Sequence, residues 1–175
     1  KSNSYIFIYS VVMVVVIATL LSVAAYSLKP AQQANMKIEK MQNILSAVKI
    51  DASTSEAETQ FNAALSDFFF VKKGTAETVS AESINQTDMF NLVNDGENLP
   101  LYDINNSYVI PLNGNGLWGP IWGYISIDKK DCNTVVGTVF DHASETAGLG
   151  AEIIKEKFRS KFEGKQIFNG SEFTS

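Results

Sequence analysis

The sequence predicts an α+β protein in which a single N-terminal transmembrane helix is followed by a twisted antiparallel sheet with packed helices. Three observations lead to this fold class. A long uncharged apolar segment opens the chain, and short runs rich in valine, isoleucine and tyrosine alternate with turn-forming residues from Leu99 onward. Segments with helical spacing lie on both sides of these runs. A length of 175 residues corresponds to one globular domain plus an accessory segment.

The uncharged segment covers residues 5–28 and is bounded by lysines. About twenty apolar residues in a helix span the hydrocarbon core of a bilayer, so this segment is long enough to cross a membrane. A signal peptide is the alternative, with Ser22 and Ala24 resembling a cleavage site, but such peptides have a shorter apolar core and a more basic start. We therefore expect a retained anchor over residues 1–29. Because lysines lie on both sides, the residues alone leave its orientation undecided.

A juxtamembrane helix and linker are expected over residues 30–54. Pro30 is expected to end the membrane helix, because proline removes a backbone hydrogen bond. Apolar residues then recur at spacings of three and four: Ile38, Met41, Leu45 and Val48.

A second helix is predicted by Ser55 and Glu58, which have the spacing of a capping box. Its expected buried face consists of Phe61, Leu65 and Phe68. The polar stretch 74–98 carries weaker signals, and we expect short strands and turns there.

Four strands are predicted from Leu99 onward, each rich in β-branched and aromatic residues. They cover residues 99–104, 107–112, 121–127 and 134–140. The sequences NNS, NGNG and DKKD supply turn chemistry between the strands. A closing helix is expected over residues 151–164, with an apolar face of Ile153, Ile154, Phe158 and Phe162.

Charge and composition exclude two classes of function. A net charge of -5 and a pI near 4.9 leave no basic surface for nucleic acid. Cys132 and His142 are the only residues of their types, which excludes an internal disulfide, a cysteine-ligated iron–sulfur cluster and a cysteine–histidine zinc site. We expect neither a metal site nor a nucleic-acid partner.

The segment SETAGLGAEI, residues 144–153, is the first candidate site. Gly148 and Gly150 lie between a predicted strand and a predicted helix start, an arrangement that directs backbone N–H groups at one point. A helix N-terminus carries about half a positive charge, so an anion or an electron-rich ring is a candidate ligand. Thr146 offers a hydroxyl and Leu149 an apolar contact. A glycine-rich connection without a ligand is the open alternative, because neither a P-loop nor G-x-G-x-x-G is present.

The segment NGNGLWGPIWGY, residues 113–124, is the second candidate site. Trp118 and Trp122 are the only tryptophans, and each is followed by glycine. Both rings could flank a planar aromatic ligand, or both could be core residues. Asp141 and His142 suggest acid–base chemistry, but adjacent residues of a strand point to opposite faces. We therefore predict no catalytic side chain.

The apolar segment through LKPAQ, the block NGLWGPIWGYI and the loop SETAGLGAEI occur in this order along the chain. Together they resemble the C subunit of the bacterial sodium-translocating NADH:quinone oxidoreductase, which is related to the G subunit of the Rnf complex. The resemblance covers nearly the whole chain and assigns residues 55–175 to an FMN-binding-type domain.

The resemblance implies a single-span protein of the bacterial inner membrane with its soluble domain in the periplasm. It implies one FMN that relays single electrons between other subunits of the pump. In this family the flavin phosphate is attached to a threonine in a downstream S-G-A-T-like motif. The cofactor-binding residues that it implies, which would hold the isoalloxazine ring and tune its potential, are Trp118, Gly119, Glu145, Thr146, Gly148, Leu149 and Gly150.

Two departures from the family pattern are visible. Ala147 stands where the family commonly has proline, so we expect a less rigid loop. No S-G-A-T-like motif follows, and Thr174 is not in that context. Either the C-terminal part of the domain lies beyond Ser175, as we expect, or this protein cannot bind flavin covalently. Two other interpretations stay open: a membrane-anchored structural or binding subunit without a redox role, and a small anchored hydrolase that uses Asp141 and His142.

Overall fold

The computed structural model describes residues 3–72, 75–78, 93, 99–170 and 172–173. Their contacts divide the chain into two compact units, Lys1–Lys37 and Ile38–Ser175. Most of the stretch 74–98, for which short strands and turns were expected, lies outside the described residues; the exceptions are 75–78 and 93.

A single helix, α1 (Asn3–Ala47), opens the chain. The expectation that Pro30 ends it is wrong, because Pro30 lies inside the helix. Alanine, glutamine, methionine and lysine dominate residues 31–37, and these good helix formers outweigh the one hydrogen bond that proline removes. Among the described residues α1 is also the one helix that is long and apolar enough, by length and composition, to cross a membrane.

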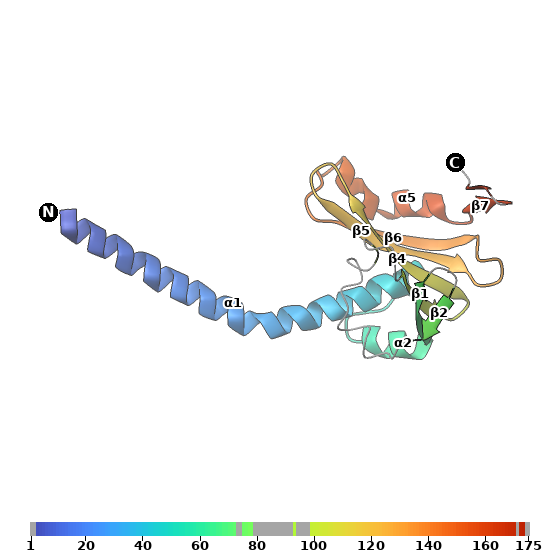
Figure 1. Ribbon diagram of the computed structural model, residues 1–175, viewed down its shortest axis with the longest axis horizontal. Coiled ribbons are helices and arrows are strands. Elements are labelled where there is room, and N and C mark those ends of the chain that lie inside the picture. Colours follow the sequence, from blue (N-terminus) through green and yellow to red (C-terminus); the bar gives the residue numbers. More distant parts are fainter. Residues whose placement is uncertain (1–2, 73–74, 79–92, 94–98, 171, 174–175) are drawn as a thin grey trace. The chain divides into compact units, whose positions relative to one another are not determined.

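The second unit is built on a six-stranded sheet in the order β2-β1-β3-β4-β5-β6 (Figure 1). All neighbouring strands are antiparallel, which confirms the predicted fold class. The strands are β1 (Leu65–Lys72), β2 (Thr75–Thr78), β3 (Leu99–Ile104), β4 (Ser107–Asn115), β5 (Pro120–Asp128) and β6 (Val135–His142). A separate small hairpin consists of β7 (Phe168–Asn169) and β8 (Glu172–Phe173).

The four predicted strands are confirmed as β3 to β6, with one difference in a turn. Residues of the NGNG sequence were expected in a loop, but 113–115 continue β4 and pair with the start of β5. The loop is instead residues 116–119, closed by a hydrogen bond from the Gly116 amide to the Gly119 carbonyl at 2.8 Å. This shift brings Trp118 to the tip of the connection.

The second predicted helix is shorter than expected. It is α2 (Ala57–Ala64), and the phenylalanine-rich residues after it form β1. The capping box of Ser55 and Glu58 does not form, because Glu56 is the residue that caps the helix and it makes no side-chain capping bond. Phe61 and Phe68 are nevertheless both buried, as predicted.

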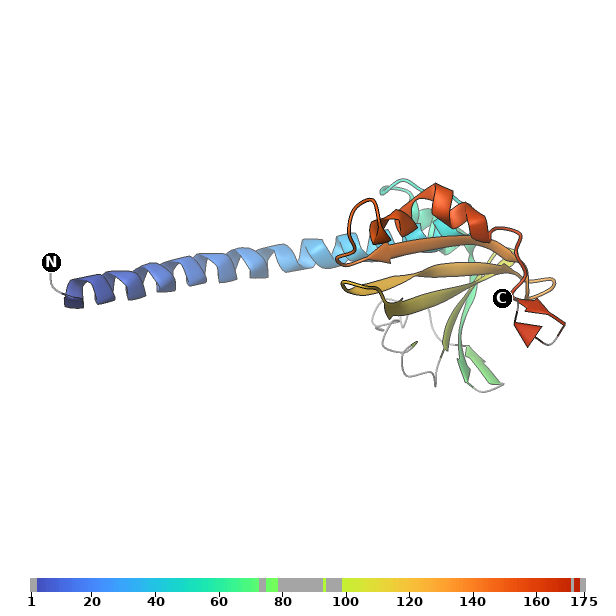
Figure 2. The ribbon, with the colours of Figure 1, turned by 90° about the horizontal axis from the view of Figure 1, so that it is seen from above.

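The two faces of the sheet are covered by different segments, which lie above and below β5 and β6 in Figure 1; Figure 2 gives the view from above. The C-terminal end of α1 and the helix α2 pack on one face, where they share a hydrophobic core with strand residues such as Tyr102, Tyr124 and Val139. On the other face the ring of Phe140 contacts the rings of Phe158 and Phe162, with centroids 5.9 and 5.5 Å away. Strand alternation explains this division, because Val139 and Phe140 are neighbours in β6.

The predicted closing helix is not continuous. It consists of η1 (Gly150–Ile154), α5 (Glu156–Arg159) and η2 (Ser160–Phe162). Lys155 is extended and interrupts the helical path. The interruption lets both phenylalanine rings reach Phe140, while Ile154, expected on the same buried face, is exposed. Packing on the sheet thus outweighs local helix propensity.

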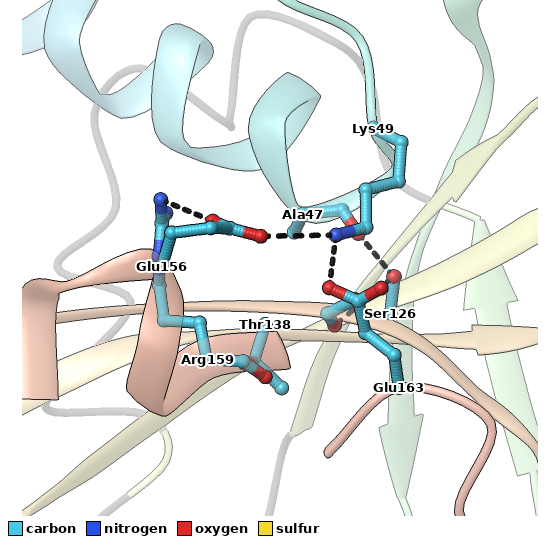
Figure 3. A network of polar contacts seen from close by, with 8 residues as sticks. Ala47, Lys49, Ser126, Thr138, Glu156, Arg159 and Glu163 are labelled. Atoms are coloured by element: carbon cyan, nitrogen blue, oxygen red, sulfur yellow. Dashed lines mark hydrogen bonds and ion pairs between the residues drawn. The ribbon is translucent and has the colours of Figure 1, made fainter. Parts of the chain in front are cut away.

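A polar network joins the end of α1 to the sheet and to the C-terminal segment (Figure 3). The hydroxyl of Ser126 in β5 donates to the carbonyl oxygen of Ala47. The ammonium group of Lys49 forms ion pairs with Glu163 and, at 3.8 Å, with Glu156. These contacts hold the last turn of α1 against the sheet.

Candidate functional site

Two loops that are distant in sequence meet at one end of the sheet. Residues 116–119 join β4 to β5, and residues 143–149 follow β6. The first residues of β5 pair with the last residues of β6, as Ile121 does with His142. Both loops therefore leave the sheet at the same end of these strands. The Ala143 amide also donates to the Pro120 carbonyl at 3.0 Å. The sheet register therefore brings the two sequence candidates, the tryptophan block and the glycine loop, into contact.

Two hydrogen bonds fix the backbone of Trp118 to the glycine loop. The Trp118 N–H donates to Oε1 of Glu145 at 2.9 Å, across 27 residues of sequence. The Ser144 hydroxyl donates to the Trp118 carbonyl oxygen at 2.7 Å. The peptide groups on both sides of Trp118 are thereby held, which fixes the direction from which its side chain leaves the loop.

The glycines of both segments have distinct physical roles. A Cβ atom at Gly116 or Gly150 would collide with the Glu145 carboxylate, and one at Gly119 would collide with the Ser144 hydroxyl. Gly148 has a φ of +77°, a left-handed conformation that strains other residues, and the space beside it is open. Three of these glycines thus make room for the polar contacts between the loops, and Gly148 forms the turn.

Large apolar side chains on these two loops are exposed. The exposed fractions are 82% for Leu117, 66% for Trp118 and 73% for Leu149. Exposed apolar side chains that gather on neighbouring loops typically mark a binding surface. Sequence reasoning identified Trp118 and Leu149 but missed Leu117 and Ser144. The position of Leu117 beside Trp118 between two glycines was an available signal, whereas nothing local marks Ser144.

The predicted convergence of backbone N–H groups on a ligand is wrong for part of the glycine loop. The Leu149 and Ala151 amides both donate to the Thr146 carbonyl oxygen at 3.1 Å. The Glu145 amide donates to Nδ1 of His142 at 3.3 Å. Because these donors have partners inside the loop and the helix η1 has only five residues, the loop offers apolar side chains and the exposed Thr146 side chain rather than a helix N-terminus.

The remaining candidates have other surroundings. Trp122 lies half-buried within β5, opposite Asn113 and Asp141, whereas Trp118 lies in the loop. The Asp141 carboxylate accepts the His142 backbone N–H at 2.7 Å. The imidazole of His142 accepts the Glu145 amide, so this ring supports the glycine loop. Among the described residues no group of three histidine, cysteine or acidic side chains could hold a metal ion.

Comparison with known protein families places the loops in a recognised domain. The family model of the FMN-binding domain matches residues 116–173, which contain both loops. A crystal structure of the C subunit of Na(+)-translocating NADH-quinone reductase from Parabacteroides distasonis is 38% identical, with a TM-score of 0.74 over 85% of this chain and 74% of that one. The structure of NqrC from Shewanella oneidensis, 22% identical with a TM-score of 0.64 over 77% of this chain and 72% of that one, shares the fold.

Curated relatives carry the same name. The C subunit of the Na(+)-translocating NADH-quinone reductase of Haemophilus ducreyi is 26% identical over 92% of this chain and 71% of its own length. The corresponding protein of Chlamydia muridarum is 45% identical over a shorter segment, 37% of this chain and 20% of the relative. The match thus spans about a fifth of the chlamydial protein.

Proposed function

Because this chain belongs to the family of the C subunit of Na(+)-translocating NADH-quinone reductase, we propose that it is an FMN-carrying, membrane-anchored part of such a complex. In this role it relays single electrons between other subunits. The observation that carries the proposal is the contact between the Trp118 loop and the glycine loop inside the segment that matches the FMN-binding domain.

The residues at these loops fit a flat ring with apolar faces and polar edges. Trp118, Leu149 and Leu117 offer exposed apolar surface, and the exposed Thr146 side chain carries a hydroxyl. Gly148 leaves open space beside the backbone. FMN, when bound, supplies one-electron chemistry, and the protein supplies orientation and surroundings. We propose that Trp118, Gly119, Thr146, Gly148, Leu149 and Gly150 line its site and that Glu145 supports it.

The anchor proposal rests on α1. Residues 5–28 carry no charge, and their large apolar side chains are exposed in the isolated chain. Burial of this surface in lipid removes the cost of its exposure to water. We propose residues 1–29 as a single span in the bacterial inner membrane, residues 30–54 as the juxtamembrane connection and residues 55–175 as the FMN-binding domain, on the periplasmic side.

FMN titration of the full chain in detergent micelles tests the cofactor part of this proposal. We expect FMN to quench the tryptophan fluorescence of the wild type. Trp118→Ala and Leu149→Ala each remove apolar contact with the ring, and we expect affinity to fall about tenfold or more, followed through the fluorescence of FMN itself.

Phe173→Ala is the matched control. Phe173 is also a large exposed apolar side chain, 78% exposed, but its hairpin is bonded to Asn133, at the opposite end of β6 from the two loops. We expect this variant to bind FMN like the wild type. Absence of FMN binding by the wild type, or equal affinity in all three variants, would contradict the proposal.

A further inference from the structure

We propose that Glu145 is a positioning residue that joins the two loops and sets the distance between their apolar side chains, without itself contacting the cofactor. We call the arrangement of Glu145 with the Trp118 amide, Gly116 and Gly150 the carboxylate clamp. The part of this inference that concerns FMN rests on the proposed function, whereas the contacts of the clamp are a property of the chain alone.

The carboxylate of Glu145 lies between the two loops. Oε1 accepts the Trp118 N–H at 2.9 Å. Oε1 also lies against Gly116 and Oε2 against Gly150, each so closely that a Cβ atom would collide with it. Oε1 therefore has a donor in the Trp118 loop and Oε2 lies close to the Gly150 backbone, whereas the side chains of Trp118 and Leu149 stay exposed. The latter two present open apolar surface to a ligand, whereas the carboxylate already accepts a hydrogen bond from the Trp118 loop.

The contact links the walls of the proposed site through one group. Glu145 touches the backbone of the Trp118 loop on one side and the backbone next to Leu149 on the other. An N–H bond to an ionised carboxylate is stronger than a bond between neutral groups. A site that is held in its binding geometry before the ligand arrives binds more tightly, because less ordering is needed on binding. The clamp thus holds the proposed FMN site in its binding geometry before FMN arrives.

Four variants separate this role from direct cofactor contact. Glu145→Ala removes the acceptor, and Gly116→Ala and Gly150→Ala displace it from either side. Glu145→Gln retains an oxygen acceptor but removes the charge. Gly114→Ala is the matched control, because its Cβ would lie 3.8 Å from Ile121 Cγ1, an ordinary contact. Thermal unfolding identifies any variant that does not fold.

The first readout is hydrogen exchange of the Trp118 amide in the chain without FMN. We expect exchange to accelerate about tenfold or more in Glu145→Ala, Gly116→Ala and Gly150→Ala, because the opened bond no longer protects the amide. Gly114→Ala should stay close to the wild type, and Glu145→Gln should accelerate exchange less than Glu145→Ala, because it keeps an acceptor that bonds more weakly than the carboxylate. Unchanged exchange in Glu145→Ala would overturn the clamp.

The second readout is FMN affinity together with the reduction potential of bound FMN. The three loosened variants should bind FMN about tenfold more weakly, and Glu145→Gln should lose less affinity than Glu145→Ala and keep the wild-type potential. A shifted potential in Glu145→Gln with unchanged Trp118 exchange would show that the carboxylate acts on the ring by its charge, which overturns the positioning role. If the wild type binds no FMN, the proposed function fails, and so does the role of the clamp in FMN binding. The exchange data then still show whether Glu145 protects the Trp118 amide.

Discussion

The hydroxyl of Ser126, in the middle of β5, donates a hydrogen bond to the carbonyl oxygen of Ala47, the last residue of α1 (Figure 3). Ser126 is completely buried, and the carbonyl oxygen of Gly137 in β6 lies 3.2 Å from the same hydroxyl. The last carbonyl groups of a helix have no partner within the helix. A single serine thus satisfies the end of α1 inside the core and connects it to β5 and to the edge strand β6.

Ser126→Ala should reduce the free energy of unfolding by about 1–2 kcal/mol, because the Ala47 carbonyl would stay buried without its donor. Urea denaturation of the full chain in detergent, followed by tryptophan fluorescence, measures the change. Ser160→Ala, at an exposed serine, is the control and should change the free energy by less than about 0.5 kcal/mol. Equal stability of the two variants would mean that the Ser126 bond contributes nothing.

Gly137 lies opposite Ser126, and its missing side chain allows the close approach of α1. A Cβ atom there would collide with the Ala47 backbone carbonyl, which cannot move without displacing the helix end. Gly137→Ala should therefore cost about 1–3 kcal/mol of stability by overpacking. Gly114→Ala, where the added carbon meets only ordinary contact, is the comparison in the same denaturation experiment. A Gly137→Ala protein as stable as Gly114→Ala would contradict the tight junction.

The ion pair of Lys49 with Glu163 lies near the surface, where its contribution is limited. The exposed fractions of the two side chains are 43% and 33%. A double-mutant cycle with Lys49→Met and Glu163→Gln should give a coupling energy below about 1 kcal/mol. Repeating the cycle in about 1 M NaCl should reduce the coupling, because salt screens exposed charges. A coupling that does not respond to salt would indicate a contact that is not mainly electrostatic.

The sequence predicted the β region well because its signals are local. Alternating β-branched and aromatic residues, broken by turn formers, identify β3 to β6 without knowledge of the partners. The boundary at Leu65 could not be found in this way. Its phenylalanines suit either a helix or a strand, and the pairing of Phe68 with Tyr102, distant in sequence, decides for β1.

The candidate site shows the same limit. Single features of the sequence, the glycines and Trp118, pointed to two loops that the structure brings into contact. The partner of Glu145 could not be predicted, because the contact with Trp118 depends on the register between β5 and β6. The resemblance implied a cofactor-binding role for Glu145, and the contacts of its carboxylate with both loops point to a structural role that no local pattern indicated. A role that depends on long-range packing is invisible in local patterns.

Asp131, in the turn after β5, gives a prediction for pH dependence. The Thr134 hydroxyl donates to its carboxylate at 2.5 Å, and backbone amides of Thr134 and Asn133 add further bonds, which lower the pKa of Asp131 below the ordinary 3.8. A lowered pKa in the folded state stabilises the protein above pH 3.8, and this contribution is lost as pH falls through the lower value. Thr134→Val should raise the pKa of Asp131 towards 3.8, measured by NMR titration of the carboxyl carbon. An unchanged pKa would assign the shift to the backbone amides alone.

Cys132 offers a direct test of membrane topology, because it is the only cysteine and is exposed in the same turn. If the domain lies in the periplasm, a membrane-impermeant maleimide should label Cys132 in intact spheroplasts as fully as in detergent-solubilised membranes. Cys132→Ser should remove the signal. Labelling only after the membrane is dissolved would place the domain in the cytoplasm and contradict the proposed orientation. The anchor is tested separately, because a membrane-spanning chain should resist alkaline extraction.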